Sequence, residues 1–293
     1  MRIGFKTAQV NVDWPTLLDT WCLADEMPVF DSGWLFDHFV ALGSGGGTSH
    51  EGWTVAAALA AHTRRLQFGH LVLSNTYRQP ALLARMATTL DHVSAGRFVL
   101  GLGAGWHAEE HEMHGWRMPP PAERVAMLDS AVRVIRALWT QRDGASVEAQ
   151  PYRLVAAHGN PPPLTPGGPP LWLGTQGPRG LLIAAKYADG WNHTGAPETF
   201  VGKRETLLRH CEAIGRDPAE IEISAQVFLR DRNYDAMVDV ATEYGRAGAR
   251  HIVLIMPASD GPDGLKRLAE RAAQPLRDRF GSAPDPGKGV PTD

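Results

Sequence analysis

Residues 95–116, AGRFVLGLGAGWHAEEHEMHGW, join an apolar, β-prone run to three glycines and then to a block of histidines and glutamates. The run over 98–103 predicts a strand. Glycines at the end of a strand let the backbone pass close to a ligand, because no Cβ stands in the way. The stretch therefore predicts a ligand site at a strand end, with titratable groups beside it.

Three interpretations of this stretch compete. A dinucleotide fingerprint needs G-x-G-x-x-G after a strand, but Trp106 stands where the third glycine is required. A zinc hydrolase motif, H-x-x-E-H, is matched by His107, Glu110 and His111, and histidines four apart share a helix face. The third interpretation is a cofactor loop that follows a barrel strand, and the rest of the chain favours it.

The composition restricts the class of protein. The 293 residues are 43% hydrophobic and 21% charged, as in globular enzymes with a core large enough to fold unaided. A net charge of −3 indicates neither a nucleic-acid nor an anionic-membrane partner. Cys22 and Cys211 indicate no disulfide framework and no cysteine zinc site. With no signal peptide and no apolar run of membrane length, we expect a cytoplasmic protein.

Strand-like and helix-like segments alternate along the chain, which is typical of an α/β fold and here predicts a (β/α)8 TIM barrel. We expect one barrel domain over 1–280. A proline-rich insertion at about 142–170, between the fourth and fifth β/α units, is expected to form a hairpin or irregular cover that shapes the substrate pocket. Residues 281–293 are expected to be a flexible tail. The predicted strands are 3–7, 32–36, 66–73, 98–103, 171–174, 190–193, 221–229 and 252–256.

The chemistry of such barrels lies at the carboxyl ends of the strands. This rule predicts a single wall of polar residues around the barrel mouth. The wall comprises Asp37, His38, residues 74–78, residues 103–111, residues 175–179, Asn192, His193, Arg230 and Met256.

Several motifs in this order carry a resemblance to a known family. They are WLFDHF at 34–39, GHLVLSNTYRQP at 69–80, LARMATTLD at 83–91, PLWLG at 170–174 and YADGWN at 187–192. With these motifs the chain resembles the luciferase-like monooxygenases, and among them the deazaflavin (coenzyme F420)-dependent oxidoreductases. The resemblance implies a TIM barrel that binds F420, hydride transfer with a small organic substrate, and a homodimer. The alternatives are an FMN-dependent monooxygenase of the same family and, from another class, the zinc hydrolase.

The resemblance also implies roles for particular residues. His38 is expected to contact the substrate and transfer the proton, since imidazole exchanges protons near neutral pH. Asp37 is expected to bind the ring edge or to hold His38. A non-prolyl cis peptide is expected at Leu71–Val72, behind the ring. Further cofactor contacts are expected from Asn75, Gly103, Gly105 and Trp106, and contacts to sugar-like hydroxyls from Glu109, Glu110 and His111.

A second cofactor segment is expected after the fifth predicted strand. Gly174, Thr175, Gln176, Gly177 and Arg179 fit a phosphate loop at a helix N-terminus, where free N–H groups and the helix dipole attract anions. The family usually has a second glycine where this chain has Thr175. Arg78 belongs to the predicted wall, but it could equally brace the third strand through a buried ion pair.

Overall fold

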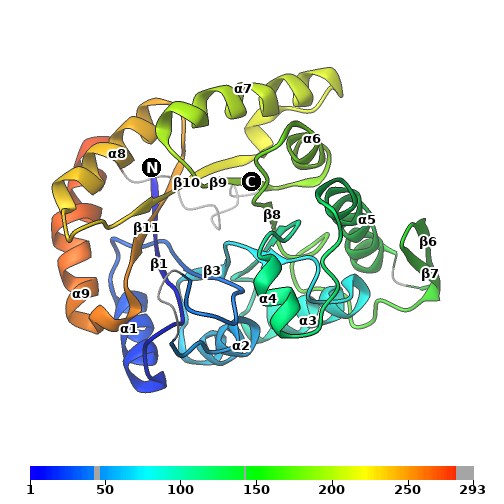
Figure 1. Ribbon diagram of the computed structural model, residues 1–293, viewed down its shortest axis with the longest axis horizontal. Helices are drawn as coiled ribbons and strands as arrows, with labels where there is room; N and C mark the ends of the chain where they lie inside the picture. Colours follow the sequence, from blue (N-terminus) through cyan, green and yellow to red (C-terminus); the bar gives the residue numbers. More distant parts are fainter. Residues whose placement is uncertain (43–46, 142, 282–293) are drawn as a thin grey trace, which may run out of the picture.

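The structure of the chain, a computed structural model, describes residues 1–42, 47–141 and 143–281. The predicted tail therefore lies almost wholly outside the described residues. A parallel sheet closes on itself, because β3 pairs with both β2 and β5 and the remaining strands follow in one ring (Figure 1). The predicted eight-stranded barrel is confirmed, with β3 and β4 sharing one position. Its strands are β1 (Arg2–Thr7), β2 (Ser32–Leu35), β3 (Gln67–His70), β4 (Leu73–Ser74), β5 (Phe98–Gly103), β8 (Leu171–Leu173), β9 (Gly190–His193), β10 (Glu222–Phe228) and β11 (His251–Met256).

Helices connect the strands and surround the barrel, as parallel strands require. Local sequence signals set several helix starts: the Asp13 side chain accepts a hydrogen bond from the backbone N–H of Thr16, and Pro15 lies in the first turn of α1. The last predicted helix begins earlier than expected, at Gly261, and contains a π-helical segment at Ala269–Ala273. The helices are α1 (Trp14–Glu26), α2 (Gly52–His62), α3 (Pro80–Val93), α4 (Ala108–Met113), α5 (Pro121–Thr140), α6 (Pro178–Tyr187), α7 (Pro197–Ala213), α8 (Tyr234–Arg246), α9 (Gly261–Leu268) and α10 (Gln274–Phe280).

The third predicted strand is broken. Residues 66–73 were expected to be continuous, but β3 ends at His70 and β4 begins at Leu73, and the Leu71–Val72 peptide bond between them is cis. The predicted non-prolyl cis peptide is thus confirmed.

Two apolar cores lie on the two sides of the barrel wall. A large cluster fills the space between the strands and the helices, whereas Trp34, Leu71, Val99, Trp172 and Val253 form a small cluster inside the barrel. The Trp34 and Trp172 rings lie 4.9 Å apart there. These side chains fill the barrel interior, so its polar chemistry is confined to the ends.

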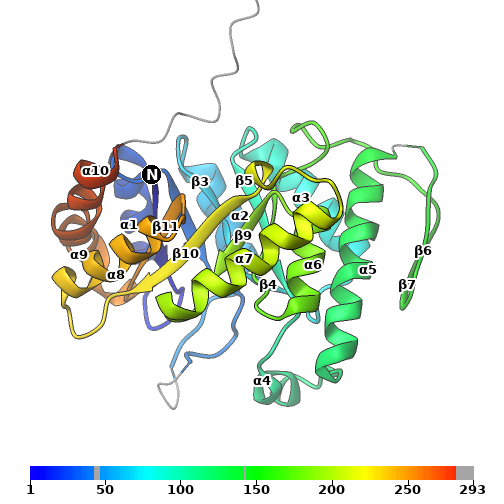
Figure 2. The same ribbon diagram turned by 90° about the horizontal axis from the view of Figure 1, so that it is seen from above.

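The insertion forms the expected hairpin. β6 (Ala145–Ala149) and β7 (Tyr152–Ala157) pair antiparallel and pack against α5, where Ser130 Oγ donates to the carbonyl of Gln150 at 2.6 Å. Figure 2 shows the hairpin on the outer side of α5. The role of the insertion in shaping the substrate pocket stays a prediction. None of the described helices is long and apolar enough to cross a membrane.

Candidate active site

The carboxyl ends of the strands lie on the side of the barrel where α4 projects (Figure 2). His38 follows β2, Tyr77 follows β4, and Glu110 lies on α4 after β5. Segments that are far apart in the sequence thus bring three polar side chains together at the barrel mouth.

His38 lies at the centre of this group. Its Nδ1 is 2.9 Å from Glu110 Oε2, and its side chain is 16% exposed. The ring also packs edge-on against Trp106, with centroids 5.4 Å apart. Since the carboxylate holds Nδ1, Nε2 is the nitrogen left for a ligand, and none of the described residues hydrogen-bonds to it. Burial lowers the pKa of His38, while Glu110 partly opposes this effect. The imidazole is therefore neutral at pH 7 and can accept a proton.

Glu110 is a buried anchor for this end of the barrel. Its carboxylate accepts hydrogen bonds from the Tyr77 hydroxyl at 2.5 Å, from the backbone N–H of Val40 at 3.2 Å and from the backbone N–H of Phe39. Burial acts to raise the pKa of Glu110, but the hydrogen bonds from Tyr77, His38 and Phe39 outweigh it and hold the pKa below its usual value. The expectation that Glu110 binds sugar hydroxyls is wrong, because the protein itself occupies both carboxylate oxygens.

Tyr77 lies within the predicted wall, but the sequence assigned no role to it. Burial and the neighbouring Glu110 carboxylate raise the pKa of its hydroxyl, so it remains a proton donor to Glu110 at neutral pH. No sequence pattern relates residues 77 and 110, because the contact joins the loop after β4 to α4 across 33 residues.

The H-x-x-E-H segment does not assemble a zinc site. His111 is buried, with Nε2 2.7 Å from Thr76 Oγ1 and Nδ1 2.7 Å from the carbonyl of His107. Both of its ring nitrogens are occupied, so His111 also has none free for the predicted cofactor contact. Within the described part of the chain, no group of three or more His, Cys, Asp or Glu side chains could hold a metal ion. Glu109 and Trp106 are exposed, Trp106 to 64%.

Asp37 pairs with Arg78, whereas it was expected to hold His38 or to bind the ring edge. Its Oδ2 accepts hydrogen bonds from Arg78 Nη1 and from the backbone N–H of Ser74, both at 2.8 Å. Arg78 also pairs with Glu51 at 2.6 Å. Burial raises the pKa of Asp37 to about 6, and Arg78 opposes a further rise, so the carboxylate is ionised at pH 7. Asp37 thus braces β4 through the backbone N–H of Ser74 and pairs with Arg78, and the carboxylate that holds His38 is Glu110.

The glycines near the break in the third strand make room for protein atoms. A Cβ on Gly101 would lie 1.8 Å from the carbonyl oxygen of His70, and a Cβ on Gly103 or Gly174 would lie 2.7 or 2.8 Å from the Val72 side chain. The expectation that these glycines open the backbone to a ligand is thus replaced by a packing role beside Val72. Gly105 has φ +82°, in the left-handed region.

Asn75 directly follows β4, two residues before Tyr77. Its backbone N–H donates to the carbonyl of Gly103 at 2.9 Å, and its side chain is buried. The phenol of Tyr152, from the hairpin outside α5, lies beside the Asn75 amide. The Oδ1 and Nδ2 atoms of that amide have no hydrogen-bond partner among the described residues, and the predicted cofactor contact stays a prediction.

The predicted phosphate loop leads into α6. Gly177 is its N-cap residue, and no side chain caps the helix. Thr175 is buried, and its Oγ1 has no hydrogen-bond partner among the described residues. Arg179 is exposed in the first turn, whereas Gln176 is held by His193, with its Oε1 2.9 Å from Nδ1. Free N–H groups, a free hydroxyl and a guanidinium at one helix end suit an anion.

A buried lysine, not predicted from the sequence, also lies at this end of the barrel. Lys6 Nζ donates to the carbonyl of Leu71 at 2.6 Å and to Gln226 Oε1 at 2.9 Å. Burial lowers its pKa to about 7. Lys6 is the penultimate residue of β1, so only the alternation of the strand could have indicated that it points inward.

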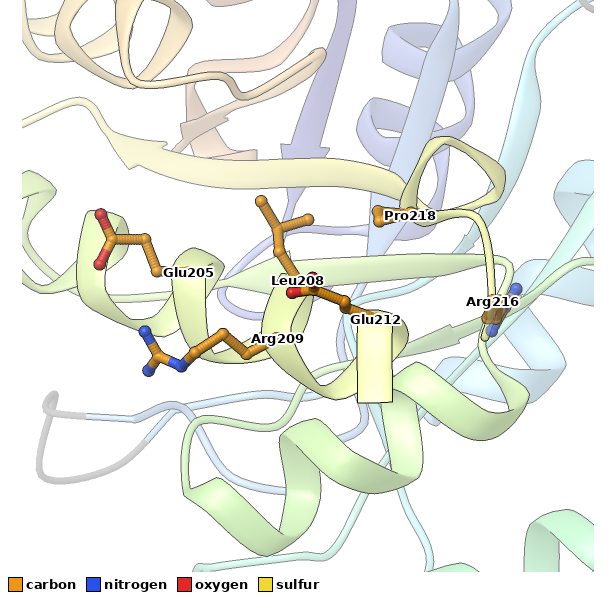
Figure 3. A pocket seen from close by; sticks show the side chains of 6 residues that line it. All are labelled: Glu205, Leu208, Arg209, Glu212, Arg216 and Pro218. Carbon is orange, nitrogen blue, oxygen red and sulfur yellow. The ribbon is translucent and has the colours of Figure 1, made fainter. Parts of the chain in front are cut away.

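Two hollows in the described part of the chain lie at different ends of the barrel. One of about 280 Å³ lies between the start of α7 and α8 and is lined in part by Gln226, Arg230 and Asn233. The other, of about 550 Å³, lies on α7 (Figure 3). It includes Arg216, which bonds to the carbonyls at the end of α6, and so belongs to the amino ends of the strands. The first hollow adjoins the predicted wall, and the second does not.

Comparison with known proteins agrees with this fold. The chain is 33% identical over 246 residues to an F420-dependent glucose-6-phosphate dehydrogenase of Amycolatopsis mediterranei (strain U-32), covering 82% of this chain and 72% of the relative. It is 29% identical over 285 residues to a phthiodiolone/phenolphthiodiolone dimycocerosates ketoreductase of Mycobacterium bovis (strain BCG / Pasteur 1173P2), covering 86% and 74%.

A solved structure shows the same fold. It is an F420-dependent secondary alcohol dehydrogenase in complex with an F420–acetone adduct, with a TM-score of 0.82 and 20% identity over 92% of this chain and 97% of that one. The family model described as luciferase-like monooxygenase matches residues 21–288. The chain therefore belongs to the luciferase-like monooxygenase family.

Proposed function

We propose that the chain is an F420-dependent oxidoreductase that moves a hydride between the deazaflavin and an alcohol or carbonyl carbon of a small organic substrate. The observation that carries the proposal is the His38–Glu110 pair, which leaves a neutral imidazole nitrogen at the barrel mouth beside exposed Trp106. The names of the two relatives, a dehydrogenase and a ketoreductase, support alcohol–carbonyl chemistry. The family resemblance further supports a homodimer.

The described residues fit such a cofactor. The uncapped start of α6, the partnerless Thr175 hydroxyl and Arg179 form a donor set for a phosphate group. Trp106 offers an exposed aromatic face close to His38. When bound, F420 would supply the hydride acceptor or donor, and these residues would hold its phosphate and ring.

His38 would manage the proton of the reaction. As an alcohol carbon gives up its hydride, Nε2 takes the hydroxyl proton and a carbonyl product forms; in the reverse direction, the imidazolium returns that proton to the carbonyl oxygen. Glu110 stabilises the imidazolium and fixes the ring orientation through Nδ1.

Titration of the purified protein with F420 and, separately, with FMN tests the cofactor. Tryptophan fluorescence reports binding because Trp106 lies beside the proposed ring site. We expect F420 to bind at least tenfold more tightly than FMN. Oxygen consumption is the second measurement, since reduced FMN reacts with oxygen and a reduced deazaflavin hardly does.

The titration has two contrary outcomes. Preference for FMN together with oxygen uptake would assign the chain to the oxygen-using members of the family. Binding of neither cofactor would overturn the proposal. His38→Asn is the control variant: we expect it to bind F420 normally but to lose most of its turnover.

A further inference from the structure

Lys6 lies inside the barrel, at the end that holds the His38 group. β1 and β11 pair with Arg2 opposite His251 and Lys6 opposite Ile255, so Lys6 lies four residues nearer the carboxyl ends than Arg2. The residue retains 8% exposure, and its ammonium donates to the Leu71 carbonyl and to Gln226. Lys6 therefore lies at the boundary between the packed interior and the mouth.

The partners of Lys6 are all uncharged. Gln226, which accepts one of its hydrogen bonds, donates in turn to Asn192 Oδ1 at 2.5 Å and to Thr194 Oγ1 at 2.8 Å. Among residues 1–42, 47–141 and 143–281, no carboxylate forms an ion pair with Lys6. A buried charge without a counter-ion is costly in free energy.

The other end of the barrel provides a contrast. Arg2 pairs there with Glu222 at 2.8 Å, and Glu222 also contacts His251 at 3.1 Å. The cation at the amino ends of the strands, Arg2, thus has a carboxylate partner, whereas Lys6, near the carboxyl ends, has only neutral partners. That difference indicates that the counter-charge of Lys6 comes from a ligand.

We propose that Lys6 is the counter-ion for the negative charge that the deazaflavin ring acquires on reduction. The inference rests on the proposed function. Transfer of a hydride to a conjugated ring adds two electrons and one proton, and so adds one negative charge unless a further proton follows. An ammonium held in a site of low polarity stabilises that charge far more than water would. Lys6 therefore favours the reduced cofactor over the oxidised one.

Anaerobic titration of the full chain with oxidised F420 and with F420 reduced beforehand tests the proposal. The quantity measured is the dissociation constant of oxidised F420 divided by that of reduced F420. Contacts that the cofactor makes equally in both states, such as those to its phosphate, cancel in this ratio. We expect Lys6→Met to reduce the preference for the reduced form by about tenfold or more, as for the loss of one close charge. Lys203→Met, which removes a part-buried cation that donates to Gln176, should leave the ratio unchanged.

A second variant tests the proposal if Lys6→Met does not fold. Gln226→Glu keeps Lys6 but gives it a carboxylate partner within the protein. Because that carboxylate already balances the charge of Lys6, the preference for the reduced cofactor should fall. If the wild type binds F420 in neither redox state, the proposed function fails. If the wild type binds both states and the two variants leave the ratio unchanged, or Lys6→Met weakens both states equally, the role of Lys6 is structural and this inference is overturned.

Discussion

Three side chains, those of His38, Glu110 and Tyr77, define the acid–base chemistry at the barrel mouth. Glu110 holds His38 through Nδ1 and is itself held by Tyr77 and by the backbone N–H of Val40. A carboxylate with this many donors stays ionised, as the lowering of its pKa shows. His38 therefore has a fixed orientation and a permanent negative charge beside it.

Glu110→Gln tests this pair. The amide keeps the shape but removes the charge that stabilises the imidazolium, so the pKa of His38 should fall further. The acidic limb of the kcat/KM profile should consequently move to lower pH, and the maximal rate should fall about 10- to 100-fold. F420 affinity serves as the control and should change little. An unshifted acidic limb would show that His38 is not the titrating base.

The break between β3 and β4 is the element that shapes the interior of the barrel. Val72 enters the space beside Gly103 and Gly174, and the His70 carbonyl approaches Gly101. Interiors are close-packed, so an added methyl group must displace one of these neighbours. At Gly101 the neighbour is backbone, which cannot rotate away.

Gly101→Ala should therefore destabilise the protein by about 2–4 kcal/mol. Gly202→Ala is the matched control, because Gly202 lies within α7 and an added Cβ would meet nothing within 4 Å. It should be neutral or stabilise by up to about 1 kcal/mol. Urea unfolding of both variants provides the comparison. Equal stabilities for the two would mean that the strand backbone adapts at Gly101.

The first strand and the last described helix meet at the opposite pole of the barrel from the active site. Arg277 on α10 pairs with Asp31 at 2.7 Å and donates to the carbonyl of Met1 at 2.9 Å. Asp31 also accepts a hydrogen bond from the backbone N–H of Ile3 at 2.6 Å. One side chain thus links the last helix, the first strand and the loop before β2.

Arg277→Ala should lower the free energy of unfolding by about 1–3 kcal/mol, since it removes the ion pair with Asp31 and the donor to part-buried carbonyls of Met1 and Val29. F420 affinity should stay within twofold of wild type, because the bonds lost are at the amino ends of the strands. Arg267→Ala, at an exposed position of α9, controls for loss of charge. Thermal unfolding and the cofactor titration measure the two effects. A large loss of affinity in Arg277→Ala would contradict the separation of closure from function.

The sequence by itself determined the barrel, the family and the position of the cis peptide. Alternating strand and helix signals are local, and a chain of eight such units has few ways to bury its apolar faces. Motifs such as WLFDHF and SNTYRQP are also local, so they selected His38 and the region of Tyr77 without a structure.

Only the tertiary structure decided which side chains meet. Glu110 became the partner of His38, and Asp37 that of Arg78, because contacts across 72 and 41 residues depend on how the loops fold over the mouth. The same folding removed His111 from the predicted cofactor wall and placed the hairpin outside α5. The environment of Lys6 was likewise decided by the tertiary structure. The local sequence does not show that this lysine faces the barrel interior without a carboxylate partner, because its partners lie on other strands and loops.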